Sequence, residues 1–396
     1  MLYKVESLGL KGDGLVRAGD LVLAVPKVLA GEEIDLAMGK LTRVVTASPE
    51  RIAPFCKHYD RCGGCKFQHW QLEPYQNWKR KLLIDALAAK GLRPEVGAIV
   101  DAHGLGRRRV SLHVREVDGV WAAGFMEQKS HDLIALDQCP VLVPALQNAM
   151  PLAAAFGLPM GNCDVAITAA DSGLDVSVKA ERKAVPRRME VLTEIVRKHD
   201  IQRLTINGEI FVATTAPTMQ VGKATVGLPV TSFLQATRKG EETLAALVLG
   251  HVKSAKHVAD LFCGIGPFAL RMAEKAKVYA ADDDKLAVAS LQAAVKNTQG
   301  LKPLKDEARE LFREPLTPLE LNLFDAVVVD PPRAGAEAQA RSLAKSKVRR
   351  VVMVSCDVMN FARDAAILVA GGYTFKTVTP VDQFKWTGHL EMVGLF

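Results

Sequence analysis

Three cysteines stand within ten residues of one another near the beginning of the chain. Cys56, Cys62 and Cys65 lie in the stretch CKHYDRCGGC, where Gly63 and Gly64 separate the last two. The chain has seven cysteines, an odd number, and its first residues show no apolar segment followed by a cleavage site. Disulfides therefore explain these thiols poorly, and we expect metal-binding or catalytic roles for some of them.

A second group of chemically interesting residues surrounds the glycine turn in DLFCGIGPFAL, residues 260–270. Gly264 and Gly266 follow an apolar strand and precede a helical stretch, so the backbone there can approach a ligand closely. About twenty residues later the next strand ends at Asp282, where a carboxylate can accept hydrogen bonds from ribose hydroxyls. Such a turn suits either a nicotinamide dinucleotide or S-adenosylmethionine. Ala269 replaces the third glycine of the dinucleotide pattern, so S-adenosylmethionine is favoured.

Two further strands end in residues that could take part in chemistry. Asp330 begins DPPRAGA, and Cys356 lies in SCDVMN directly after the next apolar strand. The carboxyl ends of parallel strands share one sheet edge, so both side chains are expected to face the cofactor. A last strand that runs antiparallel would begin at this edge and bring Glu391 near Cys356, as a thiol nucleophile beside a base. The alternatives are a buried, inert Cys356 and a surface Glu391.

These residues need a framework of alternating strands and helices, which the sequence after residue 240 supplies. Its apolar strands are expected at 257–262, 277–282, 324–330 and 349–356. The pattern predicts a doubly wound parallel α/β sheet, closed by a strand pair in YTFKTVTPV and GHLEMVGLF. The remaining strand, in LKPLKDEARELF, is heavily charged and only weakly indicated.

The N-terminal part of the chain has a different pattern. Residues 1–53 alternate apolar and polar positions in short runs, which predicts a small β-barrel that either binds RNA or aids solubility. Residues 70–92 have the apolar spacing of a helix. Residues 96–235 are strand-rich, and RRRVSLHVR at 107–115 places four arginines on a strand face that meets either solvent or RNA.

Composition sets limits on what the protein can be. The 396 residues are 49% hydrophobic and 24% charged, which fits a globular protein of two or three domains. A net charge of +7 permits nucleic-acid binding without requiring it. No apolar run reaches about eighteen residues, so we expect no membrane span and a cytoplasmic location.

Taken together, these motifs resemble those of the uracil-C5 RNA methyltransferase family. They occur in the family's order: CKHYDRCGGCKFQH, SFLQAT, DLFCGIG, DPPRAG, SC and GHLE. The resemblance spans nearly the whole chain. It implies a class I (Rossmann-like) S-adenosylmethionine methyltransferase domain at 236–396 and a barrel like the TRAM or OB fold at 1–53. Between them, at 54–235, it implies a strand-rich iron–sulfur domain whose helix 70–92 packs on the catalytic domain.

The resemblance also implies roles for single residues. Cys356 is expected to be the nucleophile and Glu391 the base. The expected cofactor contacts are Gln235, Phe262, Gly264, Gly266, Asp282, Glu310 and Asp330. Gln235 could equally touch the uracil, and Glu310 replaces the Asn or Asp that family members place near the adenine.

For the cysteines, the resemblance implies a [4Fe–4S] cluster on Cys56, Cys62, Cys65 and Cys139. Four thiolates fill the ligand positions of such a cluster, and zinc on the same cysteines is the alternative. A radical S-adenosylmethionine enzyme needs spacings of three and two residues and one open iron. This chain has spacings of five and two and a distant fourth cysteine, so a closed site that is structural or organises RNA is expected.

The implied reaction transfers a methyl group from S-adenosylmethionine to C5 of uracil in RNA. Addition of the Cys356 thiolate at C6 activates C5, and Glu391 removes the C5 proton before elimination. In the family, the cluster and the TRAM domain are typical of enzymes of 23S rRNA, so we expect a monomer whose partner is 23S rRNA. The alternatives are a tRNA uracil-C5 methyltransferase and a non-catalytic RNA-binding protein that retains the fold.

Overall fold

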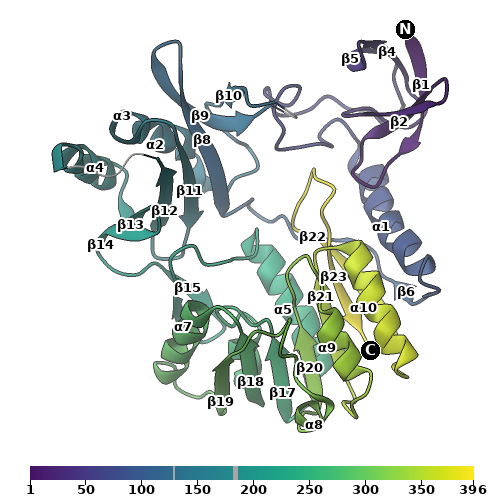
Figure 1. The fold of residues 1–396 in the computed structure, drawn as a ribbon, viewed down its shortest axis with the longest axis vertical. Helices are drawn as coiled ribbons and strands as arrows, with labels where there is room; N and C mark the ends of the chain where they lie inside the picture. The colour runs from purple at the N-terminus through teal and green to yellow at the C-terminus, as the bar shows by residue number, and fades with distance from the viewer. Residues whose placement is uncertain (128–129, 182–185) are drawn as a thin grey trace.

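The computed structural model of the chain describes residues 1–127, 130–181 and 186–396. The strands of these residues form sheets of five, seven, two and nine strands. Figure 1 shows the five-stranded sheet at the upper right, the seven-stranded sheet at the upper left and the nine-stranded sheet at the bottom. Within the described ranges, no helix has the length and apolar character that crossing a membrane requires.

The N-terminal sheet is built of short antiparallel strands around a small core. Its strands are β1 (Leu2–Leu8), β2 (Gly14–Ala18), β3 (Leu21–Val25), β4 (Glu33–Ala37) and β5 (Lys40–Thr46), in the spatial order β3-β2-β1-β4-β5. Val5, Val16 and Ile34 are buried between them. The short strands agree with expectation, whereas the barrel of the TRAM type remains a prediction.

The central sheet follows a long, mostly antiparallel path. It comprises β8 (Arg109–Val117), β9 (Val120–Met126), β10 (Leu133–Ala135), β11 (Cys163–Ala169), β12 (Leu174–Ala180), β13 (Ile201–Ile206) and β14 (Glu209–Ala213). The spatial order is β10-β9-β8-β11-β12-β13-β14, and only β12 and β13 run parallel. Its helical segments are η1 (Pro144–Leu146), α2 (Ala149–Ala155), α3 (Gly157–Met160) and α4 (Pro186–Lys198).

The C-terminal sheet is the doubly wound sheet that the sequence predicts. Seven of its nine strands are β17 (His257–Leu261), β18 (Lys277–Asp282), β19 (Leu304–Ala308), β20 (Ala326–Val329), β21 (Val351–Ser355), β22 (Thr377–Asp382) and β23 (Glu391–Leu395). The order is β19-β18-β17-β20-β21-β23-β22, and β17 to β21 run parallel. The charged strand β19 lies at the edge of the sheet, where it pairs with a neighbouring strand on one side only. Charged side chains are common on edge strands because they discourage pairing with another chain, which explains the composition of β19.

Two layers of helices cover the two faces of this sheet. One face carries α5 (Arg238–Val252), α6 (Ala269–Ala273) and α7 (Lys285–Lys296), and the other carries α8 (Pro318–Leu321), α9 (Glu337–Leu343) and α10 (Val358–Ala370). Neighbouring strand residues point to opposite layers: Val258 belongs to the hydrophobic cluster that contains Leu244 of α5, and Ala259 belongs to the cluster that contains Phe361 of α10. This arrangement confirms the class I α/β fold.

Parts of the N-terminal half also pack on the C-terminal sheet. Helix α1 (Leu72–Ala88) lies beside α10 (Figure 1). The short strands β6 (Glu95–Val96) and β7 (Val100–Asp101) pair with β22, and the hairpin of β15 (Thr218–Val221) and β16 (Ala224–Gly227) packs on α7. The domain boundaries at residues 53 and 235 remain predictions.

One expectation for the arginine strand is wrong. Arg108 meets neither solvent nor RNA, because it is buried at 4% exposure and its Nη2 lies 2.7 Å from Oε2 of Glu241. The hydrophobic alternation of β8 begins one residue later, at Arg109. Arg108 therefore belongs to the junction between the central sheet and α5.

Candidate functional site

The last strands of the C-terminal sheet place a thiol opposite a carboxylate. Strand β23 runs antiparallel to β21, and Ser355 pairs with Met392. The next pair of positions along this register is Cys356 and Glu391. Cys356 is partly exposed, whereas Glu391 is only 4% exposed. The two positions thus lie opposite each other at the rim of the sheet, and the expected antiparallel direction is confirmed.

Burial and negative neighbours hold both groups in their protonated forms. Burial, followed by the charge of Asp330, raises the pKa of Glu391 to about 8. Burial, followed by the charges of Glu391 and Asp330, raises the pKa of Cys356 to about 11, and only Arg333 among the charged neighbours favours the thiolate. Strongly shifted pKa values of this kind are common at catalytic sites.

Gln383, which our sequence reasoning missed, connects Glu391 to a second loop. It directly follows β22 and is completely buried. Its Nε2 donates to Oε1 of Gln235 at 2.6 Å and to Oε1 of Glu391 at 3.2 Å. Strand β22 is antiparallel to β23 and so ends at the same edge as β21. Asp330 and Cys356 were selected because they lie at the carboxyl ends of parallel strands. The same criterion, applied to β22, would also have found Gln383.

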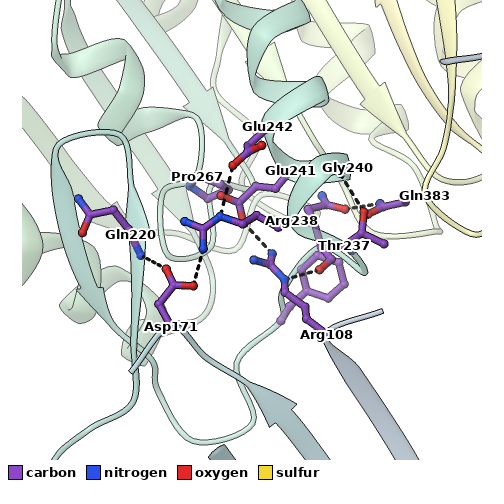
Figure 2. Close-up of polar contacts among 12 residues, drawn as sticks. Arg108, Asp171, Gln220, Thr237, Arg238, Gly240, Glu241, Glu242, Pro267 and Gln383 are labelled. Carbon is purple, nitrogen blue, oxygen red and sulfur yellow. Dashed lines mark hydrogen bonds and ion pairs between the residues drawn. The ribbon is translucent and has the colours of Figure 1, made fainter. Parts of the chain in front are cut away.

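The loop that carries Gln235 leads directly into α5, where Figure 2 shows Arg108, Thr237 and Glu241 close together. Nε of Arg108 donates to the carbonyl of Gln235 at 2.9 Å, and Glu241 pairs with Arg108 and also with Arg271, at 2.9 Å. The side chain of Thr237 caps the helix by accepting from N–H of Gly240. These buried contacts hold the Gln235 backbone next to the Cys356 edge.

The glycine turn after β17 leaves room for a ligand. Phe262, Gly264 and Gly266 have positive φ angles of 64°, 51° and 86°. A Cβ on Gly266 would meet Leu291 at 2.5 Å, whereas a Cβ on Gly264 would meet no atom within 4 Å. Gly266 therefore serves packing, and the open space lies at Gly264.

Asp282 stands beside this open space with both oxygens engaged by backbone. Oδ2 accepts from N–H of Gly264 at 2.8 Å, and Oδ1 accepts from N–H of Asp284 at 2.9 Å. Each carboxylate oxygen can accept a further bond, so Asp282 remains able to bind a ribose hydroxyl. The residues of the turn therefore fit S-adenosylmethionine.

Three other acidic residues lie around this edge in different environments. Burial and the charge of Asp282 raise the pKa of Asp330 to about 7. Asp260 is completely buried, neither of its oxygens has a hydrogen-bond partner among the described residues, and burial raises its pKa far above the ordinary value. Glu310 accepts from N–H of Phe312 at 3.1 Å and lies 3.8 Å from Arg313, so its carboxylate is engaged within its own loop.

The four cysteines near the beginning of the chain line one cavity of about 130 Å³. They are Cys56, Cys62, Cys65 and Cys139. Burial raises the pKa of the last three thiols, in the case of Cys139 to about 11. Across the described residues, no group of three or more His, Cys, Asp or Glu side chains is arranged to hold a metal ion.

Cationic side chains accompany the cysteines. Arg107 lines the same cavity, and its Nε and Nη2 are buried without a hydrogen-bond partner among the described residues. Nζ of Lys27 donates to the carbonyl of Cys62 at 3.2 Å. Two cations beside four thiols suit an anionic group bound in this cavity. In charge and composition, the four cysteines with Lys27 and Arg107 therefore fit an iron–sulfur cluster, although the cysteine side chains are not arranged as ligands of one metal ion.

Comparison with known proteins bears on the family and the fold of the chain. Residues 228–396 match the family described as tRNA (uracil-5-)-methyltransferase. An uncharacterized RNA methyltransferase of Brucella suis is 44% identical over 99% of this chain and 96% of its own length.

A second relative and one solved structure are also similar over most or nearly all of their lengths. The 23S rRNA (uracil(1939)-C(5))-methyltransferase RlmD of Halomonas elongata is 32% identical over 99% of this chain and 88% of its own length. The crystal structure of the Pyrococcus abyssi tRNA (uracil-54, C5)-methyltransferase with S-adenosyl-L-homocysteine superposes with a TM-score of 0.77. It covers 100% of this chain and 99% of that one, at 20% identity, and supports the fold.

Proposed function

The chain belongs to the uracil-C5 RNA methyltransferase family, and from this premise we propose that it methylates C5 of a uracil in 23S rRNA. The observation that carries the proposal is the opposition of Cys356 and Glu391 in the register of β21 and β23. The 23S rRNA substrate is supported by the relative from Halomonas elongata, which matches the chain over nearly all of its length.

In the proposed reaction, Cys356 adds to C6 of the uracil. Uracil C5 is a weak nucleophile, and a sulfur bound at C6 converts the ring into an enolate with electron density at C5. With a pKa of about 11, the free thiol is protonated near neutral pH and must lose its proton before it adds to C6. Because Cys356 is partly exposed, we propose that this proton passes to solvent. Protonation of Glu391 and Asp330 removes the two charges that oppose the thiolate, while Arg333 continues to favour it.

Glu391 then acts as the base that takes the C5 proton. Once sulfur is bound to carbon it carries no charge, so the ionisation of Glu391 is opposed mainly by burial and by Asp330. Glu391 first releases its own proton to solvent. After C5 has received the methyl group, the Glu391 carboxylate removes the proton from C5, the electrons of that C–H bond form the C5–C6 double bond, and the C6–S bond breaks to release the Cys356 thiolate. A pKa near the working pH is what a general base requires.

S-Adenosylmethionine, when bound, supplies the methyl group as an electrophile. We propose that Gly264 gives its backbone room and that Asp282 holds its ribose, with Phe262 and Asp330 lining the site. Phe262 lies 5.3 Å from the ring of Phe312, which makes an aromatic wall next to the open turn. Glu310 is the weakest of the proposed contacts because its carboxylate is already engaged.

We further propose that Cys56, Cys62, Cys65 and Cys139 hold a [4Fe–4S] cluster. Such a cluster would join the segment around Cys62 to the distant Cys139 and would be balanced by the nearby cations. Iron and sulfide in equal amounts, about four of each per chain, in anaerobically prepared protein would support this assignment. Equimolar zinc without iron would contradict it.

The target base must leave the RNA stack to reach the rim, at a cost of roughly a few kcal/mol. We propose that the N-terminal sheet (1–53) and the central region (54–235) hold the RNA around the catalytic part (236–396), and that a monomer suffices. The net charge of +7 is compatible with this role.

The direct test offers labelled S-adenosylmethionine with unmodified 23S rRNA and, separately, with unmodified tRNA, followed by mapping of the product. 5-Methyluridine in 23S rRNA is expected. 5-Methyluridine confined to tRNA would replace the proposed substrate, and binding of RNA without any product would favour the non-catalytic alternative.

A further inference from the structure

We propose that Gln383 is a positioning residue, whose amide orients the Glu391 carboxylate and the Gln235 side chain as one unit. The inference rests on the proposed function, in which Glu391 is the base. Gln383 is completely buried and follows β22 at the catalytic edge, and its Nε2 contacts Oε1 of both partners. A single side chain thus joins the loop before α5 to the beginning of β23.

The direction of the Gln383 amide is fixed by a backbone group. N–H of Thr237 points at Oε1 of Gln383 at 3.4 Å, and a backbone N–H can only donate. The carbonyl of Gln383 must therefore face Thr237, and its NH₂ group faces Glu391 and Gln235. The reversed amide would leave the buried N–H of Thr237 facing another donor, which is costly in the interior.

The first turn of α5 is shaped around this amide, which is a second and independent observation. A Cβ on Gly240 would lie only 2.5 Å from Oε1 and 2.9 Å from Cβ of Gln383. Glycine at position 240 therefore provides the room that the carbonyl of Gln383 occupies. Figure 2 shows Thr237, Gly240 and Gln383 together at this end of the helix.

Two consequences follow for the catalytic edge. Oε1 of Gln235 accepts from Nε2 of Gln383, so this contact sets which end of the Gln235 amide faces Gln383 and leaves the Nε2 donors of Gln235 for other partners. Glu391 receives a donor that favours its charged form, against the burial and the negative charge of Asp330 that favour the neutral form. The other ionisable groups around Glu391 are Arg333 and Cys356.

Removal of the Gln383 donor should slow the step that needs ionised Glu391 and leave the addition of Cys356 intact. In Gln383→Met, we expect release of methylated RNA to fall about 10- to 100-fold at neutral pH, because a hydrogen bond to a charged group contributes roughly that factor. The pH at which release becomes fast should move upward. The covalent adduct with 5-fluorouridine RNA should form normally, since this adduct requires no proton removal from C5.

The measurement is single-turnover release of methylated RNA over a pH range that spans the Glu391 pKa of about 8. Gln383→Glu replaces the donor by a second carboxylate and should move the profile further than methionine does. Gly240→Ala changes no side chain of the site but displaces the Gln383 carbonyl, and should move the profile in the same direction. This variant keeps the test open if either Gln383 variant does not fold.

Gln339→Met is the matched control. Gln339 in α9 is also completely buried, and its two hydrogen bonds are both with the backbone of Leu316, which precedes α8. It should lower stability without moving the pH profile of release. A profile that moves equally in Gln339→Met would mean that general loosening, and not the Gln383 amide, controls the step.

The inference and the proposed function fail in different ways. If Glu391→Gln traps the covalent RNA complex but folded Gln383 variants release product with the wild-type rate and pH profile, the inference is overturned and the base assignment stands. If Glu391→Gln itself releases product normally, the base assignment is wrong, and with it the inference that depends on it.

Discussion

Replacement of Lys79 by methionine removes the positive charge from a buried ion pair between α1 and the end of β22. Nζ of Lys79 lies 2.8 Å from Oδ1 of Asp382, and the two side chains are 0% and 1% exposed. The hydroxyl of Tyr75 donates to the other oxygen of Asp382 at 3.2 Å and also contacts the carbonyl of Thr387. The pair thus joins α1 to the residue directly before Gln383.

The expected cost follows from the charge that is left behind. Lys79→Met keeps the volume of the side chain but leaves Asp382 buried with only the Tyr75 hydroxyl as a side-chain donor, and loss of one partner from a buried pair costs about 3–5 kcal/mol. Burial lowers the pKa of Lys79 to about 8, so the intact pair is itself held at a cost. The double variant Lys79→Met/Asp382→Asn should therefore recover part of the loss.

The assay is urea unfolding of the wild type, both single variants and the double variant, with the free energies combined in a double-mutant cycle. Lys81→Met is the control, because Lys81 pairs with Asp85 on the exposed face of the same helix and should cost less than about 1 kcal/mol. A Lys79→Met loss no larger than that of Lys81→Met, or a coupling energy near zero, would refute the reasoning.

Three further predictions concern the site. Burial favours the neutral form of Glu391, so its raised pKa contributes stability that is present at low pH and is lost as pH rises from about 4.5 to about 8. Glu391→Gln should therefore make the unfolding temperature less dependent on pH between these two values. An unchanged pH dependence would contradict the burial argument. Gly266→Ala should destabilise the fold by about 1–3 kcal/mol, because the φ of Gly266 is 86° and an added Cβ would meet Leu291. Gly264→Ala should instead weaken binding of S-adenosylmethionine more than it weakens the fold. Calorimetry of unfolding and of binding separates the two effects. Arg107→Gln should lower the reduction potential of the proposed cluster, because it removes a positive charge that would stabilise the more negative, reduced state. An unchanged potential would show that Arg107 does not face the cluster.

The sequence predicted the catalytic sheet well because its signals are local. Strands β17, β18, β20 and β21 are mostly apolar runs. The parallel sheet then places each functional side chain at a strand end or in the residues that directly follow it. The opposition of Cys356 and Glu391 needed one further assumption, the antiparallel direction of the last strand, and the register of β23 agrees with it.

The parts that escaped prediction depend on contacts between distant segments. The burial of Arg108 depends on Glu241, and the role of Lys79 depends on Asp382, partners that lie far away along the chain. Gln383 escaped because a glutamine after a strand carries no motif, although its place at the strand end was readable. The strand pattern of residues 96–235 likewise could not show that β6, β7 and the β15–β16 hairpin pack on the C-terminal part.

The most direct test of the central claim is to locate the bond that forms between the protein and RNA. The protein would be incubated with S-adenosylmethionine and RNA that contains 5-fluorouridine at its target, digested, and mapped by mass spectrometry. The account predicts one crosslinked peptide, with the nucleotide on Cys356, and no adduct in Cys356→Ala. An adduct on any other residue, or one that persists in Cys356→Ala, would contradict it.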